Sequence, residues 1–223
     1  LNVSGNLPTI GLRDMTANRF AVKLVLDEMV LEAGVQPMLH ASLLDVQCEE
    51  RCVQKVRFLT KSGIFTIHPS VLIDASGDLD AARQAGARFL ELEQGESLQP
   101  ATMMFRFGPV DFKRFDALPK TELAALARQG YESGALARAA LHSSRDPFSK
   151  DGWFNISRLA VDATDALSLG RAEMEGRRQA WNAAKFLREH VPGCQEGRLQ
   201  AFGTQIGIRE TRRVEGDHVL TAQ

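Results

Sequence analysis

The segment Val71–Gly86, VLIDASGDLDAARQAG, constrains the fold of this chain most strongly. Three apolar residues run into Asp74, and the small residues Ala75–Gly77 follow before a second acid. A continuous apolar run is typical of a parallel strand buried on both faces, and the alanine-rich end predicts a short helix closed by Gly86. Because Ala75–Gly77 carry almost no side chain, a flat ligand or another backbone can approach closely there. The segment therefore predicts an α/β sheet with a ligand site at the end of this strand. The alternative is a buried strand with a tight turn into a helix and no ligand.

The composition is that of a globular protein and excludes several functional classes. Of 223 residues, 44% are hydrophobic and 25% are charged, and the formal net charge is -1. These values allow a sizeable core and leave no basic footprint for nucleic acid. No apolar run approaches the roughly 18 residues of a membrane span, and no signal peptide is recognised. We expect a cytoplasmic protein with neither nucleic-acid nor membrane partners. Nothing in the sequence indicates an oligomeric state.

The cysteines and histidines form no metal or redox motif. Cys48 and Cys52 are separated by three residues, and Cys194 stands alone. A single Cys-x-x-x-Cys pair lacks the second pair of a zinc site, and the five histidines are scattered. Asp78 and Asp80 lack the further spaced ligands of a calcium loop. We therefore predict free thiols in a reducing compartment and no bound metal.

The chain before Val71 predicts one helix followed by strands. Ala17–Ala33 has apolar residues at helical spacing and ends at Gly34. Strand patterns follow at Val35–Val46, Val53–Thr60 and Ile64–His68. We expect the first strand to be parallel, as in a Rossmann-like unit, with a three-stranded antiparallel meander between it and Asp74. Glu49–Arg51 is predicted as a hairpin tip.

The composition shifts after Gly86, and a second group of elements is predicted. The strand patterns are Gln99–Gly108 and Trp153–Ser157, and the polar loop is His142–Asp151. A short helix is predicted over Asp111–Phe115, and an alanine-rich helical stretch over Lys120–Arg138 that is interrupted at Gly130 and Gly134. The longest element is a helix over Leu169–His190, which Pro192-Gly193 ends. Its apolar stripe consists of Ala180, Ala183, Ala184, Leu187 and Val191.

The segment Val71–Gly86 resembles one found in the FAD-dependent oxidoreductase family with the glutathione-reductase type of flavin domain. Further segments resemble the same family in the same order: LDEMVLEAGV at 26–35, QPATMMFRFG at 99–108, the region of the long helix from Ala163, and QIGIRETRRVEG at 205–216. The last of these is the most specific. The resemblance extends over nearly the whole chain, from Ala17 to Thr221.

The resemblance implies that FAD is the cofactor and that a hydride passes between an unidentified small-molecule substrate and the flavin. The residues that it places at the cofactor are Ala75, Ser76, Gly77, Asp78, His40, Ala41 and Gly207. His40 as an ordinary strand residue is the alternative. We expect Asp74 to support the turn by accepting hydrogen bonds.

Arg209 and Arg212 are the candidate catalytic residues. An arginine pairs with both oxygens of a substrate carboxylate, and a cation beside the flavin would stabilise its reduced anion. The alternative is that these arginines form salt bridges between domains. If the segment is a strand, Arg209, Thr211 and Arg213 share one face of it.

We expect an α/β fold: residues 1–92 as a partial Rossmann-like FAD domain, 93–206 as a substrate domain of sheet and helices, and 207–223 as a return segment with a strand over His218–Thr221. No Gly-x-Gly-x-x-Gly loop occurs in the sequence. We also do not recognise in it the C-terminal segment, with a Gly-Asp signature, that the resemblance implies would close over the flavin. We therefore expect a fragment of a longer enzyme that binds FAD weakly or not at all, because backbone N–H groups at such a loop hold the diphosphate. The alternative is a non-catalytic interaction module derived from a flavoprotein fold. An NAD-only dehydrogenase fits less well, since the meander is typical of flavin domains.

Overall fold

The computed structural model describes residues 19–92, 96–146 and 148–218. The chain divides into two compact units. The first unit contains the helix α1 and residues Gln99–Arg209, and the second contains Val35–Leu98 and the chain from Glu210 onward. Helices and antiparallel strands are mixed in the chain, in agreement with an α/β class. The assignment of an FAD domain and a substrate domain stays a prediction.

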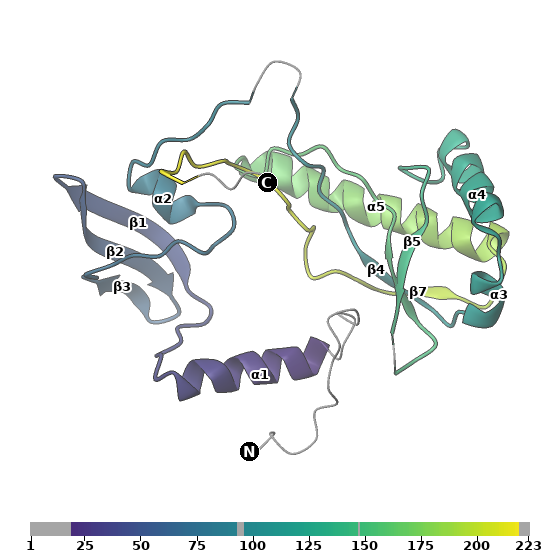
Figure 1. Ribbon diagram of the computed structural model, residues 1–223, viewed down its shortest axis with the longest axis horizontal. Helices are drawn as coiled ribbons and strands as arrows, with labels where there is room; N and C mark the ends of the chain where they lie inside the picture. Colours follow the sequence, from purple (N-terminus) through teal and green to yellow (C-terminus); the bar gives the residue numbers. More distant parts are fainter. Residues whose placement is uncertain (1–18, 93–95, 147, 219–223) are drawn as a thin grey trace. The chain divides into compact units, whose positions relative to one another are not determined.

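The second unit is built on a three-stranded antiparallel sheet in the order β1-β2-β3 (Figure 1). The strands are β1 (Ser42–Glu49), β2 (Cys52–Thr60) and β3 (Gly63–Ile67). Glu50 and Arg51 adopt left-handed backbone conformations at the first hairpin, with φ of 46° and 67°. The meander and its hairpin tip are confirmed. The separate parallel strand over Val35–Val46 is wrong, because β1 begins at Ser42 and pairs antiparallel with β2.

The sheet of the second unit packs against the short helix α2 (Asp80–Gln84). Val46, Val56 and Ala81 form a small buried cluster between them. The side-chain oxygen of Gln84 accepts a hydrogen bond of 2.9 Å from the backbone N–H of Val46. The predicted helix closed by a glycine is confirmed, since Gly86 has a φ of 83° just beyond α2.

The apolar run Val71–Ile73 is not a buried strand. Val71 is 76% exposed and Ile73 is 82% exposed, and the run is not assigned to any strand. A parallel strand needs a neighbour on which its backbone groups can pair, and the described strands all pair antiparallel with one another. The prediction from the apolar pattern was therefore wrong, and the run is an extended segment that leads into α2.

The first unit is built on a four-stranded antiparallel sheet in the order β5-β6-β4-β7. The strands are β4 (Phe105–Gly108), β5 (His142–Arg145), β6 (Gly152–Asn155) and β7 (Arg198–Phe202). β4 and β6 confirm parts of the two predicted strands. The polar loop over His142–Asp151 was wrong in its first four residues, because β5 forms a hairpin with β6. β7 had no prediction.

The long helix α5 (Ala166–His190) packs on this sheet (Figure 1). It begins where Asp165 accepts a hydrogen bond from the backbone N–H of Ser168 at 2.6 Å, an N-cap that satisfies one free donor of the first turn. Its predicted apolar stripe is buried against aromatic side chains of the sheet: Ala180, Ala183, Ala184, Leu187 and Val191 all join the core of Phe105, Phe107 and Phe154. The helix prediction is confirmed.

The shorter helices follow their predictions with shifted ends. They are α1 (Arg19–Glu32), α3 (Phe112–Asp116) and α4 (Lys120–Glu132). The interruption predicted at Gly134 is confirmed, because α4 ends just before it and Gly134 takes a φ of 75°. The interruption predicted at Gly130 is wrong, since Gly130 lies inside the helix. Leu24 and Met29 of α1 are more than half exposed, and none of the side chains described for this helix belongs to a core cluster. Among the described residues, no helix has the length and apolar character needed to cross a membrane.

Close approach between α5 and its neighbours requires a glycine at one position. A Cβ at Gly176 would lie 2.9 Å from the Cβ of Met103 and 3.1 Å from the Cδ1 of Leu159. A Cβ at Gly170, in the same helix, would have no atom within 4 Å. Alanine at Gly170 would therefore test helix propensity alone, whereas alanine at Gly176 would test helix propensity together with packing.

We predict opposite effects of alanine at these two positions. Gly170→Ala stabilises the fold by roughly 0.5–1 kcal/mol, because alanine loses less backbone entropy in a helix. Gly176→Ala has the same favourable effect on backbone entropy but destabilises the fold overall, because overpacking costs about 1–3 kcal/mol. Urea denaturation of both variants measures the difference. Equal stabilisation by both would contradict the packing of α5 on Met103.

Candidate functional site

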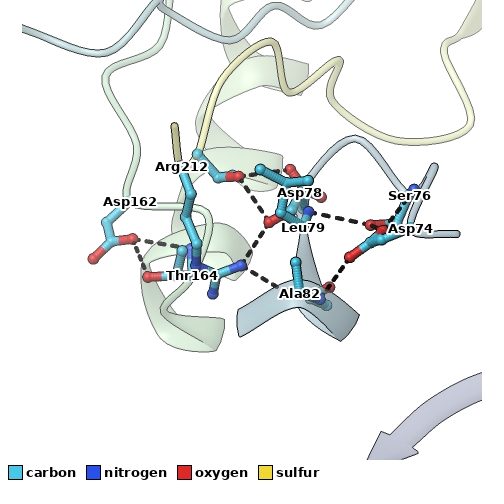
Figure 2. Close-up of polar contacts among 10 residues, drawn as sticks. Asp74, Ser76, Asp78, Leu79, Ala82, Asp162, Thr164 and Arg212 are labelled. Atoms are coloured by element: carbon cyan, nitrogen blue, oxygen red, sulfur yellow. Dashed lines mark hydrogen bonds and ion pairs between the residues drawn. The ribbon is translucent and has the colours of Figure 1, made fainter. Parts of the chain in front are cut away.

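The carboxylate of Asp74 organises the turn Ala75–Leu79 in the second unit (Figure 2). Its Oδ1 accepts hydrogen bonds from the N–H of Ser76 at 3.0 Å and from the Ser76 hydroxyl at 2.7 Å. Its Oδ2 accepts one from the N–H of Ala82 at 2.9 Å, and Ser76 Oγ accepts one from Leu79 at 3.2 Å. The expectation that Asp74 supports the turn is confirmed.

These hydrogen bonds also set the ionisation of Asp74. Partial burial of its carboxyl opposes the charged form, but the hydrogen bonds from Ser76 and from the backbone of Ala82 and Ala81 outweigh it and lower the pKa below its usual value. Asp74 is therefore an anion at neutral pH. The turn depends on that charge, because a protonated carboxyl accepts fewer hydrogen bonds.

The backbone around Gly77 is open. Gly77 has a φ of 87°, and a Cβ built there would have no atom within 4 Å. Within the described residues, the N–H groups of Gly77 and Asp78 donate to no protein acceptor. Backbone donors free of protein partners on a rigid turn are typical of a site for polar ligand atoms.

Leu79 closes the turn in a left-handed conformation with a φ of 59°. This conformation is disfavoured for leucine by about 1–2 kcal/mol, so the hydrogen bond to Ser76 and the start of α2 must hold it. The sequence could not show this feature, because leucine has no preference for such a turn.

The segment from Thr211 to Glu215 is joined to this turn and to the chain after α2. The hydroxyl of Thr211 lies 3.0 Å from Asp78 Oδ1. Arg212 donates to the carbonyl oxygen of Asp78 at 2.7 Å and to the carboxylate of Asp80 at 2.8 Å. A short antiparallel bridge between Phe89 and Val214 extends the contact. All of these residues belong to the second unit.

The three arginines near the C-terminus have different surroundings. Arg212 donates hydrogen bonds to Asp78 and Asp80 of the turn and of α2. Arg213 forms ion pairs with Glu210 at 2.5 Å and with Glu96 at 3.0 Å, and its hydrogen bonds to these carboxylates raise its pKa further above its ordinary value. Arg209 is exposed, and within the described chain it forms no ion pair. The segment is not a strand, so the expected alternation of its side chains does not apply.

The remaining predicted cofactor residues fall in both units. His40 and Ala41 directly precede β1 in the second unit, where His40 is exposed with a φ of 55°. Gly207 belongs to the first unit, where its backbone pairs with Thr102 through hydrogen bonds of 2.7 and 3.2 Å. Four predicted residues, Ala75 to Asp78, are thus consecutive in one turn. The predicted strand over His218–Thr221 falls mostly outside the described residues.

The described part of the chain contains no cluster of metal-ligating side chains. No group of three or more histidine, cysteine, aspartate or glutamate residues there could hold an ion. Cys48, Cys52 and Cys194 are free thiols, as predicted. Burial raises the pKa of the Cys194 thiol to about 12, so it is an inert core residue.

We predict that Asp74→Asn destabilises the protein at neutral pH by about 1–2 kcal/mol, because an amide replaces a charged acceptor. The pKa of Asp74 is lowered in the fold, so its contribution is present above about pH 4 and is lost as the pH falls through the folded-state value. The stability difference between the two proteins should therefore shrink on acidification. Urea denaturation across this pH range measures it, with the exposed Asp217→Asn as the matched control. A pH-independent difference would contradict the role of the charge.

Comparison with known proteins places the chain in a family. The model of the FAD dependent oxidoreductase family matches residues 6–223. No significant match was found among curated proteins or among solved structures. The family match covers almost the whole chain and includes the turn around Gly77 and the arginine segment. This chain therefore belongs to the FAD dependent oxidoreductase family, whose cofactor and flavin-dependent redox chemistry its name states.

Proposed function

We propose that this chain supplies cofactor and substrate contacts to an enzyme that transfers a hydride between a carbon of a small-molecule substrate and FAD. Family membership supports the flavin-dependent redox chemistry. The observation that carries the proposal is the turn Ala75–Asp78: it is held by hydrogen bonds to Asp74, has little side-chain bulk, and presents two backbone N–H groups without a protein acceptor among the described residues.

The turn fits a flavin nucleotide in its donor chemistry and its shape. The N–H groups of Gly77 and Asp78 suit the oxygen and nitrogen acceptors of such a group, and the absent side chain at Gly77 permits close approach. We propose that His40 and Ala41, at the entry to β1, contact the adenine end, and that Gly207 also contacts the cofactor. When bound, FAD supplies the acceptor of the hydride.

The surroundings of the arginines suggest separate roles for them. Arg209 has no carboxylate partner in the described chain, so its guanidinium is available to an external anion. A carboxylate of the substrate would accept two parallel hydrogen bonds from it. Arg212 is already engaged by Asp78 and Asp80, so we propose that it acts on the cofactor contact by positioning the turn.

We propose that tight FAD binding needs a phosphate-binding loop in addition to these 223 residues. No Gly-x-Gly-x-x-Gly motif occurs in the sequence, and α2 beside the turn has only five residues. A diphosphate is usually held by backbone N–H groups at the start of a full helix. The chain would then be part of a longer enzyme, and alone would bind FAD weakly or not at all.

The absorption spectrum of protein purified from the full natural reading frame tests the proposed function. We expect the visible bands of oxidised flavin, and release of FAD on denaturation. A colourless protein that stays colourless after FAD is added would overturn it and favour a non-catalytic interaction module. Tight, stoichiometric binding by the 223-residue chain alone would instead overturn only the need for a further loop.

We predict that Arg209→Gln in the full protein raises the KM for a carboxylate substrate by roughly 10- to 100-fold, since a charged hydrogen-bond pair is lost. Arg128→Gln, which removes an equally exposed cation from α4, is the control and should change little. Anaerobic flavin reduction in a screen of small carboxylic acids gives the measurement. An unchanged KM with unchanged turnover would remove Arg209 from the site.

A further inference from the structure

The first unit contains a small cavity of about 310 Å³ between the C-terminal half of α5 and the start of β7. Phe107 and Ala184 are buried and form its inner wall, while Trp181 is 50% exposed at its rim. Gly197 and Leu199 complete the apolar part. The volume lies at the lower end of the roughly 300–1,000 Å³ typical of small-molecule pockets. The cavity can therefore hold a group about the size of one aromatic ring with a short substituent.

Three cations surround this apolar cavity: Lys185, Arg188 and Arg198. None of them has an ion-pair partner among the described residues, whereas Arg177 and Arg178, earlier in α5, pair with Glu173 and Glu175. No aspartate or glutamate of the described residues lines the cavity. Within that part of the chain, no carboxylate therefore pairs with the charges at its rim.

The combination of an apolar wall with cations restricts the ligand. Lys185 Nζ lies 5.7 Å from the centre of the Trp181 ring, so the indole and the ammonium group sit at one edge of the cavity. An apolar body would bury against Phe107 and Trp181, and an anionic group would meet the guanidinium groups of Arg188 and Arg198.

A second cavity in the same unit, of about 690 Å³, lacks this complementarity. It contains Lys113, Arg114 and Lys150, but Asp111 and Glu196 also line it. Asp111 is engaged as the N-cap of α3, where it accepts from the N–H groups of Lys113 and Arg114. Mixed charge gives no preference for an anion, so the smaller cavity is the better candidate.

We propose that the cavity at Trp181 binds a small carboxylate with an apolar, preferably aromatic, body. This inference goes beyond the proposed function: the site is made only of residues of the first unit, and its occupation needs no flavin. It adds a second binding site for a small organic acid to the chain.

Saturation-transfer NMR on the 223-residue chain tests the site with three probes of similar size. Phenylacetate carries the carboxylate, phenylacetamide is neutral, and phenethylamine is a cation. We expect phenylacetate to bind with a Kd on the order of 1 mM, at least threefold more tightly than the amide, and the amine not to bind. Addition of FAD should leave the phenylacetate affinity unchanged.

Substitutions at the cavity test whether phenylacetate binds there. Arg188→Gln and Arg198→Gln should each weaken phenylacetate about two- to fivefold, and Trp181→Ala should weaken both phenylacetate and the amide. Arg128→Gln on α4 is the matched control and should have no effect. These side chains are all exposed, and circular dichroism melts verify that each variant folds. Equal binding of all three probes, no binding of phenylacetate at about ten times the expected Kd, or equal effects of Arg198→Gln and Arg128→Gln would each overturn the proposal.

Discussion

The ionised carboxylate of Asp74 is the interaction on which the candidate site depends. It accepts hydrogen bonds from both sides of the turn, at Ser76 and at Ala82, and so ties the extended chain to α2 without the help of a sheet. With those bonds in place, Leu79 can hold an unfavourable conformation and Gly77 can leave its backbone open. The free N–H groups of Gly77 and Asp78, which make the turn suited to a cofactor, thus depend on the charge of Asp74.

The C-terminal segment adds a second constraint from far along the sequence. Thr211 and Arg212 contact Asp78 and Asp80, more than 130 residues earlier in the chain. Because Arg212 donates to a backbone carbonyl of the turn and also to a side chain, its loss would free the turn as well as a charge. Arg213 is neutralised by two glutamates. Of the three arginines in this segment, Arg209 is the one without an ion-pair partner among the described residues.

Local patterns predicted the elements whose partners lie nearby. The stripe of α5 and the alternation of β2 matched their buried faces, and the pattern of small residues after Asp74 indicated the turn. All five residues of β3 are exposed despite its alternating pattern. The pattern of Val71–Ile73 wrongly predicted a buried strand, because an apolar run does not show whether a neighbouring strand exists to pair with it. β5 was missed because its pairing comes from the hairpin with β6 rather than from apolar residues of its own. The separate roles of the three arginines needed the tertiary contacts, since no spacing distinguishes a paired guanidinium from a free one.

We propose that the backbone N–H groups of Gly77 and Asp78 are the protein groups that contact FAD. Hydrogen exchange resolved by residue, on protein from the full natural reading frame with and without FAD, tests it most directly. We expect these two amides to exchange quickly in the apoprotein and to slow on addition of FAD, while those of Ser76 and Ala82, already bonded to Asp74, change little. Protection that appears elsewhere on FAD binding but leaves Gly77 and Asp78 unchanged would contradict it.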